Sequence, residues 1–138
     1  MTRARLTRID HIGVVVADFG AHVDQLEALG LELRREGSDD ESHVRHYLSG
    51  DSSIELIDVL DERARSERLA EGELARIEHI AFEVESLEDV RAVLEGRGVE
   101  VSWPPYASAS GPMIWTTAAT SGGVQYQFFV RRADGDST

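Results

Sequence analysis

An internal repeat constrains this 138-residue chain more than any other feature of its sequence. The run IDHI at 9–12 recurs as IEHI at 77–80, which is 68 residues later. Near the end of the first half, IEL at 54–56 corresponds to YQF at 126–128, which is 72 residues later. Each half predicts the order β-α-β-β-β. Because one such half is too small to bury a sheet face alone, the two halves must complete each other.

The boundaries of the two halves follow from strand-like alternation and from helix caps. The first module, about 8–60, predicts a helix over 20–29, which Asp18 caps and Gly30 ends. Residues 61–75 are charged and predict a connector with one or two helical turns. The second module, about 76–131, predicts a helix over 87–94 and a long loop of which 107–112 is expected to act as a lid. We expect strands over 8–16, 31–36, 43–49, 52–60, 76–84, 99–103, 113–118 and 124–130.

Composition narrows the classes of function. The chain has 14 basic and 26 acidic residues and a net charge of −12, which disfavours nucleic acid and anionic membranes as partners. It has no cysteine, so disulfides, thiolate metal sites and cysteine nucleophiles are excluded. No apolar run approaches the ~20 residues of a membrane span, and none follows the basic N-terminus as in a signal peptide. We expect one cytoplasmic domain over 1–138.

Four polar residues interrupt apolar strands at positions related by the repeat. They are His11 and His79 in the opening strands and Glu55 and Gln127 in the closing strands. A lone strand histidine is more often a core residue, and a lone glutamate usually faces solvent. Two histidines at one repeat position favour another interpretation, because buried polar groups need a partner. Two imidazoles, a carboxylate and an amide oxygen suit a divalent first-row metal that acts as a Lewis acid.

At these residues the sequence resembles the vicinal oxygen chelate superfamily, which contains glyoxalases, methylmalonyl-CoA epimerases, extradiol dioxygenases and antibiotic-resistance proteins. The resemblance covers about 8–131. The segments RIDHIGVVVADF, IELIDVL, IEHIAFEVESLEDVRAVLEGRGVEV and SGGVQYQFFV are most similar to the methylmalonyl-CoA epimerase branch. The resemblance implies an α+β fold of two paired βαβββ modules that form a U-shaped open barrel with a central cleft. It also implies a homodimer and a metal bound by His11, Glu55, His79 and Gln127.

The sequence departs from the epimerase pattern at two positions. The glutamate that serves as general base on the third strand corresponds to His46 here, and the last-strand glutamate corresponds to Gln127. Imidazole titrates near physiological pH, so His46 is the candidate base, provided that it faces the cleft with Val44 and Leu48 rather than solvent. An amide cannot carry a proton at neutral pH. Trp115 and Tyr126 are candidate substrate-binding residues, with core packing as the alternative.

Together these features predict a metal-dependent epimerase or isomerase that acts through an enolate-like intermediate. The expected cofactor is a divalent ion of Co, Ni, Mn, Zn or Fe. The expected substrate is a small hydroxy or keto acid, an acyl-CoA or a keto-cyclitol, as in secondary metabolism. Two alternatives stay open: a resistance-type protein that sequesters a ligand without a catalytic metal, and a glyoxalase-like lyase or Fe(II) dioxygenase.

Overall fold

The computed structural model describes residues 4–131, which form two compact units. The first unit comprises residues 11–78, and the second comprises residues 4–10 together with 79–131. Strand β1 (Leu6–Val16) therefore enters the first unit at residue 11, and strand β5 (Ala75–Val84) enters the second at residue 79. Each unit is described by itself below.

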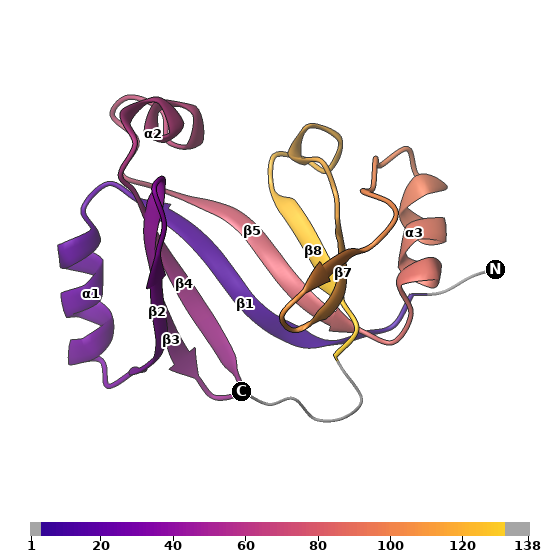
Figure 1. The fold of residues 1–138 in the computed structure, drawn as a ribbon, viewed down its shortest axis with the longest axis horizontal. Helices are drawn as coiled ribbons and strands as arrows, with labels where there is room; N and C mark the ends of the chain where they lie inside the picture. Colours follow the sequence, from indigo (N-terminus) through magenta and orange to yellow (C-terminus); the bar gives the residue numbers. More distant parts are fainter. Residues whose placement is uncertain (1–3, 132–138) are drawn as a thin grey trace. The chain divides into compact units, whose positions relative to one another are not determined.

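The first unit is a four-stranded sheet with one helix against a face (Figure 1). Its strand order is β2 (Glu32–Ser38), β3 (Ser42–Ser49), β4 (Ser52–Val59) and β1. Strand β1 is parallel to β4, whereas β3 is antiparallel to both β4 and β2. As predicted, Asp18 caps α1 (Phe19–Ala28) by accepting the Ala21 N–H at 3.0 Å, and Gly30 follows the helix with φ +89°.

The two faces of this sheet carry different side chains because strand residues alternate with a period of two. On the face toward α1, a core forms around Val16, Leu56 and Tyr47. On the opposite face, Val15 and Ile57 belong to a core that includes Leu69, directly after α2 (Glu62–Arg68). The predicted connector is thus helical for about two turns. It packs on Val15 and Ile57, which share a face with His11 and Glu55.

Tyr47 is a buried phenol whose hydroxyl reaches charged side chains at the edge of the first unit. It is 0 % exposed, donates to Glu27 Oε2 at 2.8 Å and accepts from Arg45 Nη1 at 3.1 Å. Burial raises the pKa of Tyr47 above its usual 10.0, and the hydrogen bond to Glu27 raises this pKa further. The folded state therefore favours the neutral phenol.

The raised pKa of Tyr47 gives the protein an alkaline limit to its stability. Above pH 10 the unfolded chain releases this proton more readily than the folded chain, so the free energy of unfolding falls as pH rises. We expect Tyr47→Phe to cost about 1 kcal/mol at pH 8, through the lost hydrogen bonds, and to flatten the decline between pH 10 and 11. Urea unfolding of both proteins across this range measures both effects. A decline of equal slope in the variant would contradict the assignment to Tyr47.

The second unit repeats the same topology. Its strand order is β5, β8 (Gln125–Phe129), β7 (Gly111–Trp115) and β6 (Tyr106–Ser108), with β5 parallel to β8. Helix α3 (Leu87–Glu95) packs on one face through a core that includes Val90, Ile114 and Phe128 (Figure 1). A short 3-10 helix, Ala118–Thr120, precedes β8. The predicted α+β class and the repeated βαβββ order are confirmed.

Two predictions for the second unit were wrong. The strand expected over 99–103 is reduced to an isolated bridge between Val101 and Thr116. The segment 107–112, expected to be part of a long loop, instead forms a hairpin, in which Ala107 lies opposite Pro112 and Ser108 opposite Gly111. Its expected role as a lid stays a prediction. Pro112 has no N–H to donate, but its carbonyl accepts the Val130 N–H at 3.3 Å. The glycine before it adopts a φ of +143° that suits a tight turn.

In residues 4–131, every helix is too short or too polar to cross a membrane.

Candidate functional site

Cross-strand pairing in the first unit brings its polar residues into two neighbouring rows. In one row Arg35 lies opposite His46, and His46 lies opposite Glu55. In the next row Ser53 lies opposite His11. Residues directly opposite each other in a sheet share a face. As predicted, His46 shares a face with Val44, which belongs to the core of that face, whereas Tyr47 belongs to the core of the other.

Glu55 lies between two histidines and uses a different carboxylate oxygen toward each. Its Oε1 is 3.7 Å from His11 Nε2, and its Oε2 is 3.3 Å from His46 Nε2. The two imidazole rings lie 5.5 Å apart at 77° to each other. Only 15 % of the Glu55 side chain and 4 % of the His46 side chain are exposed. The sequence predicted all three residues, and the first unit brings them together.

The His11–Glu55 pair has the chemistry of half a metal site. An imidazole nitrogen and a carboxylate oxygen, each about 2.1 Å from one ion, lie roughly 3.0–3.5 Å apart. The observed 3.7 Å needs only a small adjustment to reach that separation. Nitrogen and oxygen donors suit Zn, Mn, Fe, Co and Ni. These two residues fit a divalent metal, and binding through Oε1 would leave Oε2 for His46.

His46 Nε2 has two charged neighbours, one a hydrogen-bond donor and the other an acceptor. Arg35 Nη2, which can only donate, lies 3.3 Å from this nitrogen, and Glu55 Oε2, which can only accept, lies at the same distance. The neutral nitrogen can accept from Arg35. The protonated nitrogen can instead donate to Glu55. Nε2 of His46 therefore has a hydrogen-bond partner in place for either protonation state.

Ser53 adds a hydroxyl to this face of the first unit. The residue is 2 % exposed, and its Oγ has no hydrogen-bond partner among residues 4–131. It lies opposite His11 and two positions before Glu55, so it shares their face. Its hydrogen-bonding capacity is one that no described residue uses.

In the second unit, His79 and Gln127 share the sheet face opposite α3. His79 pairs with Gln125, and Trp115 pairs with Gln127, whereas the alternate residues of these strands form the core under α3. His79 is 7 % exposed. Gln127 donates its amide nitrogen to Gln125 Oε1 at 2.9 Å, a bond that does not use the amide oxygen of Gln127. That oxygen is the atom of Gln127 able to ligate a cation.

Tyr126 lies on the other face of β8 from Gln127. Its ring belongs to the apolar core under α3 and lies 6.2 Å from the ring of Phe82. It also lines an apolar cavity of about 300 Å³ beside Val93 and Leu94. The two residues predicted to bind substrate, Trp115 and Tyr126, therefore point to opposite faces of this unit.

Three polar residues on these faces, Ser53, Gln125 and Arg35, were missed by sequence reasoning, although Ser53 is only two positions before the predicted ligand Glu55. Gln125 could have been found, because it is two positions from Gln127 and strand alternation puts both on one face. Arg35 could not, because the expected alternation of 31–36 placed it with Leu33. The register shifts between Leu33 and Arg35, and this irregularity is not visible in the sequence.

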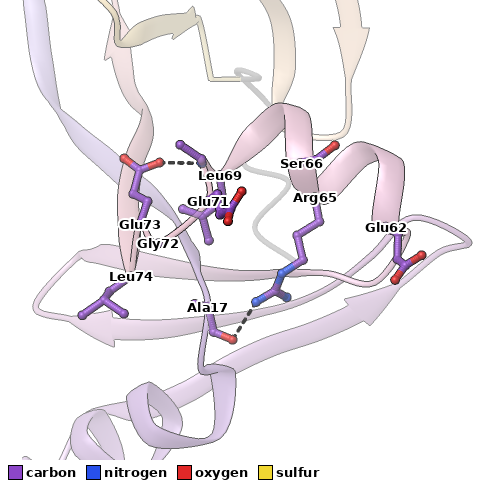
Figure 2. A pocket seen from close by; sticks show the side chains of 10 residues that line it. Ala17, Glu62, Arg65, Ser66, Leu69, Glu71, Gly72, Glu73 and Leu74 are labelled. Atoms are coloured by element: carbon purple, nitrogen blue, oxygen red, sulfur yellow. Dashed lines mark hydrogen bonds between the residues drawn. The ribbon is translucent and has the colours of Figure 1, made fainter.

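One cavity of the first unit does not coincide with the polar rows. It has a volume of about 570 Å³ and lies beside α2 and the segment that follows it (Figure 2). There Arg65 donates to the Ala17 carbonyl at 2.9 Å, and Glu73 Oε1 accepts the Ala70 N–H at 2.9 Å. The Arg65 bond fastens α2 to the residue that follows β1, whereas the Glu73 bond lies within the connector. We assign this cavity a structural role.

Comparison with known families shows which superfamily the chain belongs to. A family model described as the glyoxalase/bleomycin resistance protein/dioxygenase superfamily matches residues 10–115. The chain belongs to this superfamily. The matched range contains His11, His46, Glu55 and His79, whereas Gln127 lies beyond it. No curated protein matches the sequence.

Solved structures show that the chain has the fold of the superfamily. Methylmalonyl-CoA epimerase from Mycobacterium tuberculosis is 19 % identical with a TM-score of 0.75, and the match covers 100 % of this chain and 97 % of that one. Streptomyces coelicolor methylmalonyl-CoA epimerase, in complex with 2-nitronate-propionyl-CoA, is 23 % identical with a TM-score of 0.67 over 94 % of this chain and 100 % of that one. A hypothetical protein from Bacillus halodurans is 24 % identical with a TM-score of 0.68, over 94 % and 95 % of the two chains.

Proposed function

We propose that this superfamily member is a metal-dependent epimerase or isomerase that removes a proton next to a carbonyl group. The observation that carries the proposal is the arrangement around Glu55. One oxygen of this carboxylate faces a potential ligand, His11, and the other faces a potential base, His46. A ligand pair and a base on one sheet face suit the formation of an enolate.

The metal site is proposed from the repeat and from family membership. His11 and Glu55 of the first unit would be ligands together with His79 and Gln127 of the second, since these positions correspond in the repeat. A bound divalent ion would supply Lewis-acid polarisation of a carbonyl oxygen.

His46 would perform the proton transfer. Its neutral Nε2 takes the proton from the substrate carbon, and the electron pair of the C–H bond moves toward the carbonyl oxygen. The new N–H then donates to Glu55 Oε2, which stabilises the imidazolium. Return of the proton by His46 to a neighbouring atom gives an isomer. Epimerisation needs a second acid that delivers a proton to the opposite face of the same carbon, after which His46 passes its own proton to solvent.

The substrate class is proposed from the same chemistry. It comprises hydroxy and keto acids, keto-cyclitols and acyl thioesters. Each of these carries a C–H on the carbon next to a carbonyl or carboxyl group. The likeness to methylmalonyl-CoA epimerases makes acyl-CoA the first member to test. Trp115 lies on the same face as Gln127 and is the residue of the second unit proposed to contact substrate.

Deuterium exchange tests this proposal directly, because it needs removal of the proton and return of a deuteron from solvent, whichever face or atom receives the deuteron. The purified protein is loaded in turn with Co, Ni, Mn, Zn and, without oxygen, Fe(II), and is incubated in D₂O with methylmalonyl-CoA, hydroxy and keto acids, and a keto-inositol. We expect one class to lose its α-proton signal in NMR faster than in the protein-free control. Absence of exchange in every combination would reject the proposal. Oxygen consumption by the Fe(II) form would support a dioxygenase instead.

A further inference from the structure

A β-bulge turns one arginine toward His46. Before the bulge, Leu33 lies opposite Tyr47, whose side chain belongs to the core under α1. Regular alternation would put Arg35 on that same face. The register shifts between Leu33 and Arg35, so Arg34 is the extra residue and Arg35 lies opposite His46. Bulges commonly re-aim a side chain beside a functional site.

Unlike most described arginines, Arg35 forms no ion pair with a carboxylate among residues 4–131. The chain has a net charge of −12, and most described arginines are in ion pairs, such as Arg45 with Glu36 and Arg68 with Glu78. Arg35 has no acidic side chain within 4.0 Å among residues 4–131, and its one polar contact is with His46 Nε2. The residue is exposed. Its guanidinium is thus a cation available to a ligand beside the proposed base.

We propose that Arg35 binds an anionic group of the substrate, and specifically a carboxylate, next to His46. The inference rests on the proposed function and narrows its substrate class to acids. A guanidinium presents paired N–H donors that match the two oxygens of a carboxylate. When the guanidinium turns to the substrate, it leaves the lone pair of His46 Nε2 free to take the proton.

Binding of a simple dicarboxylate tests the inference without catalysis. Malonate and its neutral analogue malonamide are titrated by calorimetry into the metal-loaded protein and into protein stripped with a chelator. We expect Arg35→Gln to weaken malonate binding by about 10- to 100-fold in both forms, the loss of a charge-assisted hydrogen bond. The neutral malonamide should bind equally weakly to the wild type and to Arg35→Gln.

Two variants control for the change in charge. Arg34→Gln alters the neighbouring exposed arginine and removes the same charge, and we expect it to weaken malonate binding by less than about 2-fold. Arg35→Lys keeps the charge but loses the paired donors, so its affinity should lie between those of the wild type and Arg35→Gln. Once an acid whose α-proton exchanges has been identified, Arg35→Gln should raise KM for that acid far more than it lowers kcat.

Several results would overturn the inference. They are no malonate binding by the wild type, undiminished binding by Arg35→Gln, and an equal loss in Arg34→Gln. Malonate titration involves no proton transfer, so its outcome is independent of the proposed reaction. Arg35-dependent binding without any deuterium exchange would keep the anion site and reject the epimerase. Exchange without Arg35-dependent binding would do the reverse.

Discussion

The His46→Ala variant is expected to lose deuterium exchange into the substrate by about 10²- to 10⁴-fold, the usual contribution of a general base. Its metal content should equal that of the wild type. The reason is the division of Glu55 between its two neighbours: Oε2 faces His46, whereas Oε1 faces the proposed ligand His11. Removing the imidazole removes the proton acceptor and leaves the ligand pair intact. NMR exchange rates and elemental analysis of the same preparation measure both quantities.

The control for this experiment lies three residues away on the same strand. His43 packs on the opposite side of β3, 2.8 Å from Glu36 Oε2 and with its ring 5.3 Å from that of Phe19. His43→Ala removes an imidazole without touching Glu55, and it should exchange at close to the wild-type rate. Because His46 is buried, alanine leaves a cavity at its position. The variant His46→Gln refills most of that space with a group that cannot act as a base.

Near wild-type exchange by His46→Gln, in a folded protein with full metal content, would show that another group removes the proton. Loss of metal in both His46 variants would instead give the imidazole a part in the metal site. The pair of measurements separates these roles, because a base affects only the rate and a ligand affects both.

The repeat and the alternation within strands predicted most of the first unit. A period of two is enough to put His46 and Val44 on one face and Tyr47 on the other, and a cap residue and a glycine are enough to bound α1. These rules act over a few residues, so they can be read locally. The pairing of His46 with Glu55 is not local, but it follows once the two strands form a hairpin whose turn is signalled at Gly50.

What the sequence did not reveal depends on pairing between strands. The bulge that brings Arg35 to His46 is a property of the β2–β3 register, and two consecutive arginines give no signal of which one is the extra residue. The hairpin of β6 and β7 is likewise stabilised by pairing between strands. Small residues such as Ala107 and Ser108, which are common in loops, give no sequence signal of that pairing. Tyr126 was assigned to the substrate because of its type, whereas alternation from Gln127 already predicted the opposite face.

Loss of one metal ion by two variants is the second large effect that we expect. Wild-type protein loaded with its preferred metal should bind about one equivalent per chain, and His11→Ala and His79→Ala should each retain less than about a tenth of that, because removing one imidazole from a four-ligand site removes a principal donor. The prediction is demanding because the two histidines belong to different units. Two independent half-sites would lose metal in only one variant at a time.

Gln125 and Gln127 provide the matched comparison for the weakest proposed ligand. They share a face of β8 and are joined by a hydrogen bond that uses the oxygen of Gln125 and the nitrogen of Gln127. If the oxygen of Gln127 is a ligand, Gln127→Ala should weaken metal binding and Gln125→Ala should do so much less. Equal behaviour of the two variants would leave the site with His11, Glu55 and His79. Failure of the wild type to bind any of the five metals would exclude these ions as the Lewis acid. A ligand-sequestering protein of the same superfamily would then account for the fold without the reaction.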